Sequence, residues 1–227
     1  MANGKQQTKL GKAKIIIVDD HPIVRQGLAD LINQEKDLAV CGQAEDAAEA
    51  MVTIRELEPD LVIVDITLAD SSGIELIKDI KVQYPDLPVL TLSMHDESLY
   101  AERALRAGAK GYIMKGETTK NVVTAIRKVL AGQIYTSDRV AAKMVSKLVG
   151  GKAKVGASPL ECLSDRELEV FQLIGQGNGT RRIAEKLYLS IKTIETYRAH
   201  IKEKLNLTDT NQLLRYAIQW VNSQEKL

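Results

Sequence analysis

The stretch LVIVDITL at residues 61–68 opens with four apolar residues and reaches a carboxylate at Asp65. An unbroken run of Leu, Val and Ile of this length is typical of a strand buried on both faces of a parallel sheet. Similar short runs recur on either side, and each is followed by a segment with apolar residues at helical spacing. This alternation predicts a five-stranded parallel sheet with helices on both faces, an α/β flavodoxin-like doubly wound fold. The predicted strands are residues 15–18, 38–42, 61–64, 89–92 and 110–114, and the predicted helices are residues 22–35, 47–57, 73–83, 98–107 and 119–131.

The pattern changes after Gly132, where apolar spacing becomes helical throughout. Residues 137–149 predict one helix. The following segment GGKAKVGASP, residues 150–159, has almost no large apolar side chain, which is typical of a flexible linker. The sequence therefore predicts three parts: an α/β domain at residues 14–132, a linker helix and flexible linker at 133–159, and a small all-α domain at 160–225.

The composition of the 227 residues, 44% hydrophobic and 27% charged, is that of an ordinary globular protein with room for two cores. Cys41 and Cys162 fall in different predicted domains and make neither a metal-binding spacing nor a disulfide framework, so we expect reduced thiols. No apolar run is long enough for a signal peptide or a membrane span, and we expect a cytoplasmic protein that does not act in a membrane.

Polar side chains stand where the predicted strands end. Because ligands of a doubly wound sheet bind beyond the carboxyl ends of its strands, we expect these side chains to meet at one edge. Carboxylates brought together there would repel one another unless a cation neutralised them, and hard oxygen ligands suit Mg²⁺. A hydroxyl and an ammonium group at the same edge suit the oxygens of a phosphoryl group, so the set predicts Mg²⁺-assisted transfer of a phosphoryl group to a carboxylate. The set consists of Asp19, Asp20, Asp65, Ser93 and Lys115.

A single aspartate at a strand end more often caps a helix or solubilises a loop than it binds a ligand. The joint placement of five groups at four strand ends makes the functional interpretation the favoured one. His21 and His95 lie near this edge in the sequence, but we interpret them as a helix-entry residue and a loop residue, not as metal ligands.

The segments VDDHPIVRQGL, LVIVDITL and GAKGYIMK resemble the receiver domain of two-component response regulators, over roughly residues 14–132. The resemblance implies that Asp65 is the phosphoacceptor and that Asp19 and Asp20 hold Mg²⁺ together with it. It also implies Mg²⁺-dependent self-phosphorylation and slow self-dephosphorylation, and no other enzymatic activity. The chain departs from the family at Ala69, where Pro is frequent; this alters the loop after the third strand but no ligand.

Four further residues have roles that the resemblance implies. Thr67 would contribute its carbonyl oxygen to the metal, Lys115 would pair with the phosphoryl group, and Ser93 would hydrogen-bond to it. Tyr112 would be the aromatic switch residue that turns inward.

The run from Leu163 to Leu207 has the features of a helix-turn-helix, with the motif at about residues 180–204. A first helix at 180–187 turns Ile183, Ala184 and Leu187 inward, and after a short turn a second helix at 191–206 buries a face at 3-4-4 spacing. Its opposite face mixes cations for phosphates with short or hydrogen-bonding side chains for base edges. Residues 181–204 hold seven Lys or Arg against three acidic residues, although the net charge of the whole chain is only +1.

The parts LSDRELEV, IAEKL and KTIETYRAHIKEKL resemble the LuxR-type helix-turn-helix, as arranged in response regulators of the NarL/FixJ family. Tyr197 stands where that family usually has His, and Gly179-Thr180 replaces a more usual polar pair. A solvated basic helix is the ordinary alternative, but a receiver-like domain on the same chain favours DNA binding. The residues expected to contact DNA are Thr180, Lys192, Thr193, Glu195, Thr196, Arg198, Ala199 and Lys202.

Together these features predict a phosphorylation-switched regulator of transcription. The partners expected are a sensor histidine kinase, promoter DNA and, after phosphorylation, a second copy of the chain. Whether phosphorylation releases the DNA-binding domain or rearranges it stays open.

Three other functions fit the sequence less well. A Mg²⁺-dependent phosphatase of the haloacid dehalogenase class needs a second acid two residues after the nucleophile, and this chain has Thr67 there. A ligand-sensing LuxR-type regulator needs an aromatic pocket, which one Phe and one Trp do not supply. A regulator that works without phosphorylation has no use for the complete set of acids.

Overall fold

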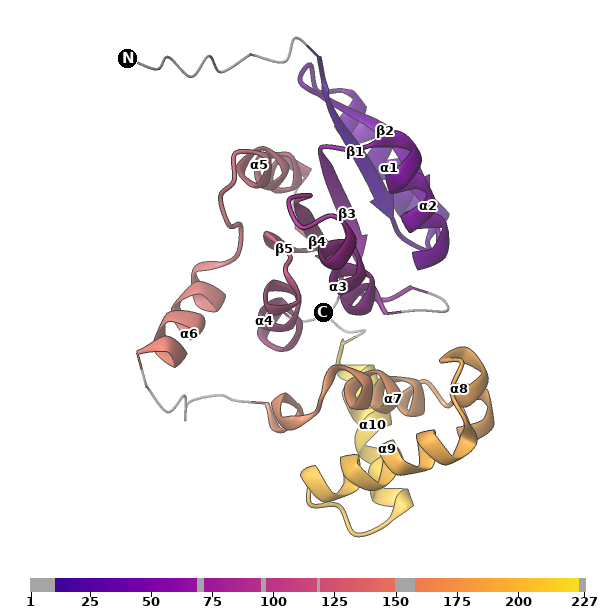
Figure 1. Ribbon diagram of the computed structural model, residues 1–227. Helices are drawn as coiled ribbons and strands as arrows, with labels where there is room; N and C mark the ends of the chain where they lie inside the picture. Colours follow the sequence, from indigo (N-terminus) through magenta and orange to yellow (C-terminus); the bar gives the residue numbers. More distant parts are fainter. Residues whose placement is uncertain (1–10, 69–71, 95–96, 118, 150–157, 225–227) are drawn as a thin grey trace.

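The computed structural model describes residues 11–68, 72–94, 97–117, 119–149 and 158–224 (Figure 1). Ala69, His95 and most of the predicted linker, residues 150–157, lie outside the described residues.

The five predicted strands form one parallel sheet in the order β2-β1-β3-β4-β5, which confirms the doubly wound prediction. Four strands are longer than predicted, β1 and β2 by two residues each and β3 and β4 by one, because backbone pairing continues beyond the apolar runs, while β5 is one residue shorter. Lys14 pairs with Ala39 before the run of β1, and Val18 pairs with Ala44 after that of β2. The strands are β1 (Ala13–Val18), β2 (Leu38–Ala44), β3 (Leu61–Asp65), β4 (Val89–Ser93) and β5 (Gly111–Met114).

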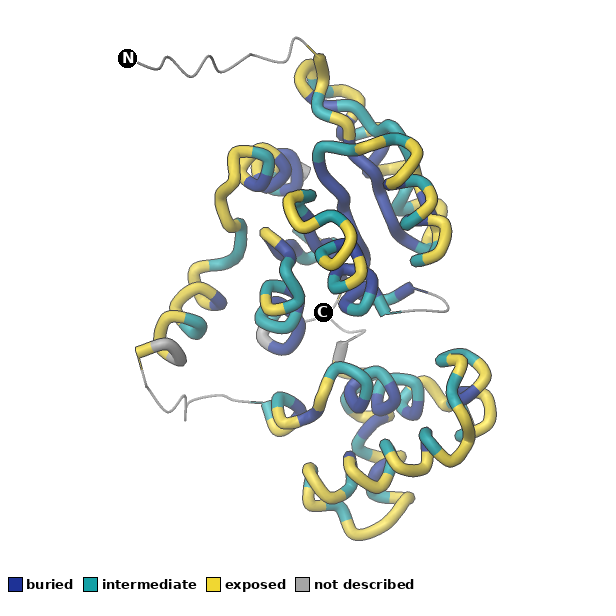
Figure 2. Tube along the Cα trace, viewed as in Figure 1, coloured by how far each residue is buried: buried dark blue, intermediate teal, exposed yellow. Residues whose placement is uncertain are grey.

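Side-chain alternation along the strands divides the core into two layers. Ile15 and Ile17 of β1 pack with the helices on one face, α1 and α5, while Ile16 and Val18 pack on the other face, which α2, α3 and α4 cover. Both faces of the sheet are therefore buried (Figure 2), and polar side chains are expected at the rim formed by the carboxyl ends of the strands. The helices are α1 (Pro22–Asn33), α2 (Ala47–Leu57), α3 (Gly73–Gln83), α4 (Glu97–Ala107) and α5 (Thr119–Leu130). We call the unit from β1 to α5 the α/β domain.

After α5, the described elements are helices, as expected. Phe171 is fully buried at the centre of the last helices, in edge-on contact with Tyr216 at 5.5 Å and tilted against Trp220 at 5.7 Å between ring centroids. A capping box begins α7: the Ser164 hydroxyl accepts from the Glu167 amide, and the Glu167 carboxylate accepts from the Ser164 amide. The elements are α6 (Asp138–Leu148), the 3₁₀ helix η1 (Pro159–Cys162), α7 (Asp165–Gly175), α8 (Thr180–Lys186), α9 (Ile191–Lys204) and α10 (Thr210–Gln224). We call the unit from η1 to α10 the helical domain.

The segment between the two domains is attached to the α/β domain. Tyr135 closes the outer edge of β5, because its amide donates to Lys110 and its carbonyl accepts from Tyr112, each at 2.9 Å. Val140 of α6 is buried and α6 packs against α4. The exposed edge of the sheet is thus covered by the chain itself. None of the described helices is long and apolar enough to cross a membrane.

Candidate functional site

The carboxyl ends of the strands bring three of the predicted residues into direct contact. Lys115, just after β5, places its ammonium nitrogen 2.6 Å from Asp19 Oδ2 and 2.6 Å from Asp65 Oδ2. Asp19 follows β1 and Asp65 ends β3, so the contact joins side chains 96 and 50 positions away from the lysine. All three side chains are almost inaccessible to solvent, with 2%, 4% and 6% exposure for Asp19, Asp65 and Lys115. The contact is a buried ion triad with one cation for two anions.

Burial and the neighbouring charges act in opposite directions on the pKa values of Asp65 and Lys115. Removal from water raises the pKa of Asp65 to about 6, although the charge and hydrogen bond of Lys115 act to lower it. Burial alone would lower the pKa of Lys115, but the charges and hydrogen bonds of Asp65 and Asp19 outweigh it, and the pKa is raised. Asp65 is therefore ionised near neutral pH, but at a cost in free energy that a further cation would relieve.

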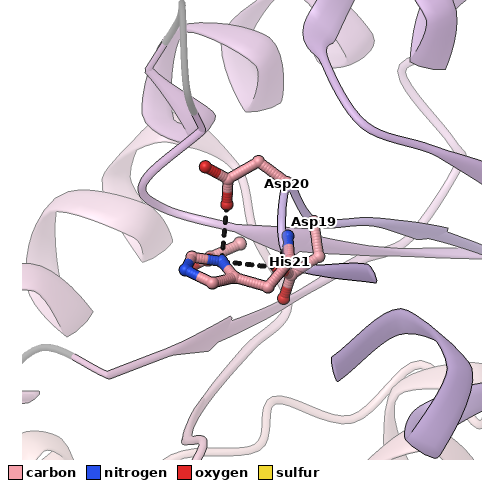
Figure 3. Close-up of side chains that lie close together, drawn as sticks. Asp19, Asp20 and His21 are labelled. Atoms are coloured by element: carbon pink, nitrogen blue, oxygen red, sulfur yellow. Dashed lines mark hydrogen bonds and ion pairs between the residues drawn. The ribbon is translucent and has the colours of Figure 1, made fainter. Parts of the chain in front are cut away.

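Asp20 follows Asp19 of the triad, and its carboxylate faces the His21 ring (Figure 3). Its Oδ1 is buried without a hydrogen-bond partner among the described residues; the nearest basic group, His21 Nδ1, is 2.7 Å away. The His21 amide donates to Asp19 Oδ1 at 2.9 Å, and the ring itself is 62% exposed. The position of His21, first residue before α1, agrees with its interpretation as a helix-entry residue.

The pocket fits a magnesium ion. Ligand oxygens of Asp19, Asp20 and Asp65 lie within 4.8 Å of one another, in one cluster that also includes the His21 ring. Three hard oxygen donors, one of them without a hydrogen bond, and an excess of negative charge are what Mg²⁺ requires. This acidic pocket is typical of the magnesium site of receiver domains.

The residues expected to sense a phosphoryl group lie next to Asp65 and Lys115 or in the buried core. Ser93 is fully buried at the end of β4, and its carbonyl accepts from the Lys115 amide at 2.8 Å. Tyr112 of β5 is 3% exposed and packs in the core layer beneath α4. Thr67 donates its amide to Asp65 Oδ1 at 3.4 Å, which holds the start of the following loop against the acceptor carboxylate.

In the helical domain, α8 and α9 form the expected pair. Ser190 is the N-cap of α9, and its hydroxyl accepts from the Thr193 amide at 3.1 Å. Ile194 and Ile201 are fully buried, and Tyr197 and Leu205 pack partly, so the predicted 3-4-4 face is the inner face of α9.

The residues expected to contact DNA lie on the outer side. Lys192, Glu195, Thr196 and Ala199 are exposed along α9, while Thr180, Thr193, Arg198 and Lys202 are partly exposed. Among the described residues, none of these eight side chains forms a hydrogen bond or an ion pair with the α/β domain.

Sequence reasoning missed a third group of residues, which joins the two domains. Arg103 of α4 and Lys78 of α3 both bond to Asp165, the first residue of α7, and Tyr100 bonds to Gln172. Nothing in the apolar spacing distinguished these residues from an ordinary solvated helix face.

With this geometry established, comparison with known proteins gives the class. Residues 15–127 match the response regulator receiver domain, and residues 161–217 match the bacterial regulatory proteins of the luxR family. The chain belongs to the NarL/FixJ family of response regulators, DNA-binding transcription regulators of two-component systems.

Two relatives are similar in sequence to this chain over nearly its whole length. The chain is 37% identical to the oxygen regulatory protein NreC of Staphylococcus carnosus over 210 residues, 91% of this chain and 97% of that protein. NreC of Staphylococcus epidermidis is 36% identical over 211 residues.

Solved structures give the same class. RcsB from Salmonella enterica serovar Typhimurium, bound to the promoter rprA in the presence of the phosphomimetic BeF₃⁻, is 27% identical with a TM-score of 0.68 over 91% of this chain and 98% of RcsB. A LuxR-family response regulator from Aurantimonas is 38% identical with a TM-score of 0.57 over 61% of this chain and 99% of its own.

Proposed function

We propose that this response regulator is switched by phosphorylation of Asp65 and that the switch controls its binding to promoter DNA. The observation that carries the proposal is the contact of Lys115 with both Asp19 and Asp65 at the carboxyl rim of the sheet. A carboxylate that is buried, paired with a cation and placed beside two further carboxylates is suited to act as a nucleophile next to a metal.

The phosphoryl donor we propose is the phosphohistidine of a sensor histidine kinase. A carboxylate oxygen of Asp65 forms the new P–O bond while the P–N bond to the kinase imidazole breaks, and the imidazole leaves with the electron pair. Asp19, Asp20 and Asp65, with the Thr67 carbonyl, would hold Mg²⁺, which neutralises charge on the transferred group. Lys115 pairs with a phosphoryl oxygen in exchange for one of its present carboxylates.

The acyl phosphate then changes its surroundings. The Ser93 hydroxyl donates to a phosphoryl oxygen, and Tyr112 stabilises the switched form from its place beneath α4. Water slowly hydrolyses the acyl phosphate, so the signal has a finite lifetime. The new charge thus shifts the α/β domain from its unphosphorylated form towards the switched form, and no chemical product is released as the signal.

The output we propose is binding of two copies of the chain to paired DNA half-sites. The exposed face of α9 carries cations and hydrogen-bonding side chains, as expected of a helix that enters the major groove. RcsB is described as dimers on DNA in one solved structure. Because the net charge of the chain is close to zero, one DNA-binding domain alone gains little affinity for DNA from electrostatic attraction. Binding of two copies to two half-sites would supply the missing affinity. These steps belong in the cytoplasm, where kinase, chromosome and Mg²⁺ meet.

Acetyl phosphate with Mg²⁺ tests the phosphoacceptor. Peptide mapping by mass spectrometry is expected to find one phosphoryl group, on the peptide that contains Asp65, and none in Asp65→Asn. Hydroxylamine should remove this group, as expected of an acyl phosphate. Modification of another residue at equal yield in Asp65→Asn would refute the assignment. A metal-dependent phosphatase, the nearest enzymatic alternative, would instead turn over acetyl phosphate many times per chain.

A further inference from the structure

One acidic side chain stands among the residues of α9 that are expected to contact DNA. Glu195 is the fifth residue of α9 and is exposed. In a helix-turn-helix, the residues near the beginning of the second helix reach the edges of the bases. Glu195 therefore lies where a side chain would meet DNA most closely, although the phosphates on either side of the groove repel a carboxylate. Such a group costs affinity unless it accepts a hydrogen bond from a base.

The carboxylate of Glu195 has no partner among the described residues of the protein. Two cations, Lys192 and Arg198, lie one turn away from it on the same helix. Even so, Glu195 forms neither an ion pair nor a hydrogen bond with any described residue. Glu185 of α8, by contrast, lies 3.2 Å from the guanidinium of Arg181. The acceptor oxygens of Glu195 are therefore available to a partner outside the chain.

The side chains next to Glu195 on the outer face of α9 are short. Thr196 and Ala199 are both exposed, and the Thr196 hydroxyl donates to the Lys192 carbonyl of its own helix at 3.0 Å. Ala199 presents only a methyl group, and Thr196 presents little more because its hydroxyl is bonded within the helix. The helix can thus lie deep in a major groove, where a side chain as long as glutamate reaches the base edges. Lys192 and Arg198 remain for the phosphates.

A carboxylate only accepts hydrogen bonds, and this limits the bases that it can read. In the major groove, only the exocyclic amino groups of cytosine and adenine donate, whereas guanine and thymine present acceptors. Adenine places its N7 acceptor beside the amino group, so a carboxylate that approached adenine would also meet a second acceptor. Cytosine has no acceptor on its major-groove edge. Cytosine is therefore the base whose edge complements a glutamate.

We infer that Glu195 is a specificity-determining residue, which accepts a hydrogen bond from the exocyclic amino group of one cytosine in each DNA half-site. The inference rests on the proposed function, because it requires α9 to enter a major groove. Without that cytosine, the carboxylate loses water near the phosphates and finds no complementary donor. Glu195 thus weakens binding to most sequences and spares those that carry the cytosine, which raises the ratio of specific to non-specific affinity.

Selection from a random duplex library tests the inference, with the full chain treated with Mg²⁺ and beryllofluoride. The wild type should enrich a motif with one C·G pair at which Glu195→Ala loses its preference. Glu195→Gln should change that preference from cytosine to adenine, because a glutamine amide bonds to both the amino group and N7 of adenine. Glu203→Gln is the matched control, since Glu203 is an exposed glutamate in the last turn of the same helix and should leave the motif unchanged.

Affinities for defined duplexes measure the size of the effect. Replacing the C·G pair with T·A should weaken binding of the wild type at least about fivefold, and binding of Glu195→Ala less than about twofold. A cytosine analogue that lacks the exocyclic amino group should give the same pattern, and the double-mutant cycle of this analogue with Glu195→Ala isolates the single hydrogen bond. On duplexes of random sequence, Glu195→Ala should bind more tightly than the wild type, because it removes a negative charge.

The outcomes separate the two claims. If the treated wild type enriches no motif, the proposed binding to promoter DNA fails. If the wild type enriches a motif and both Glu195→Ala and Glu195→Gln enrich the same motif, Glu195 does not read a base and the inference is overturned. It is also overturned if the position that changes is not a C·G pair, or if the cycle with the cytosine analogue shows no coupling.

Discussion

Lys115 and Asp65 are joined by a contact of 2.6 Å between ammonium and carboxylate, and this contact makes the lysine a built-in counter-ion of the acceptor. The same ammonium group also contacts Asp19, another of the carboxylates proposed to hold the metal. A magnesium ion and the Lys115 ammonium group would therefore compete for the carboxylates of Asp19 and Asp65.

The first prediction follows from this competition. Replacing Lys115 with Met removes a buried positive charge beside the metal ligands, and Mg²⁺ should bind at least about threefold more tightly in calorimetry, since unit charges at such distances interact strongly even at high effective dielectric. Lys110→Met at the other end of the same segment is the control, because the Lys110 side chain is exposed. Weaker or unchanged binding in Lys115→Met would contradict the assigned competition.

The second prediction concerns the cost of burying Asp65. Its pKa in the folded protein, about 6, exceeds the ordinary value of 3.8, so the folded state holds the proton more firmly than the unfolded state does. The ionised carboxylate therefore costs stability above pH 6, and this cost disappears as the pH falls below 3.8. Without metal, Asp65→Asn should be more stable than the wild type by about 1–3 kcal/mol above pH 6, because each pKa unit corresponds to about 1.4 kcal/mol.

Urea unfolding in EDTA, followed by circular dichroism, measures this difference. The gain should shrink as the pH falls from 6 towards 4, and saturating Mg²⁺ should shrink it as well, since the metal stabilises only the wild type. A gain that is independent of both pH and Mg²⁺ would mean that the charge of Asp65 is not its cause.

The fold and the acidic pocket were predictable because their signals are local. Runs such as residues 61–64 are typical of strands buried on both faces of a parallel sheet, and parallel strands bring their carboxyl ends to one rim. The meeting of Asp19, Asp65 and Lys115 follows from topology alone. The 3-4-4 spacing predicted the inner face of α9 for the same kind of reason.

The contacts between the domains were not predictable in this way. Arg103 and Asp165 are separated by 62 positions, and a linker lies between them. In the sequence, each looks like an ordinary charged residue on a solvated helix face. Likewise, no pattern indicated that Tyr135 would close the edge of β5, since this contact uses only backbone groups. Long-range pairing of ordinary polar residues depends on the docking geometry of two complete domains, which no local pattern specifies.

The third prediction concerns the capping box of α7. Ser164→Ala leaves the Glu167 amide without its side-chain acceptor and should lower the stability of the helical domain by about 1 kcal/mol. The single Trp, Trp220, packs against Phe171 in this domain, so its fluorescence reports the unfolding of this domain. Ser223→Ala, at the end of α10, should change the midpoint little, and an equal loss in both variants would argue against a specific cap.

The fourth prediction concerns DNA contacts. Lys192→Gln removes an exposed cation at the beginning of α9 and should weaken binding to duplexes of random sequence uniformly, while lowering the slope of log affinity against log salt by about 1. Glu203→Gln, on the same helix, should leave that slope unchanged or raise affinity slightly. A salt slope that does not change in Lys192→Gln would remove this residue from the phosphate contacts.

If the chemistry at Asp65 controls DNA binding, it must change the affinity of the protein for a selected operator. An operator is first obtained from a random duplex library with the beryllofluoride-treated wild type, and its dissociation constant is then measured with and without beryllofluoride for the wild type and Asp65→Asn. We expect the treated wild type to bind the operator about tenfold more tightly or better, and Asp65→Asn to show no response. Equal affinity of the wild type in both conditions, or an equal response in Asp65→Asn, would contradict it.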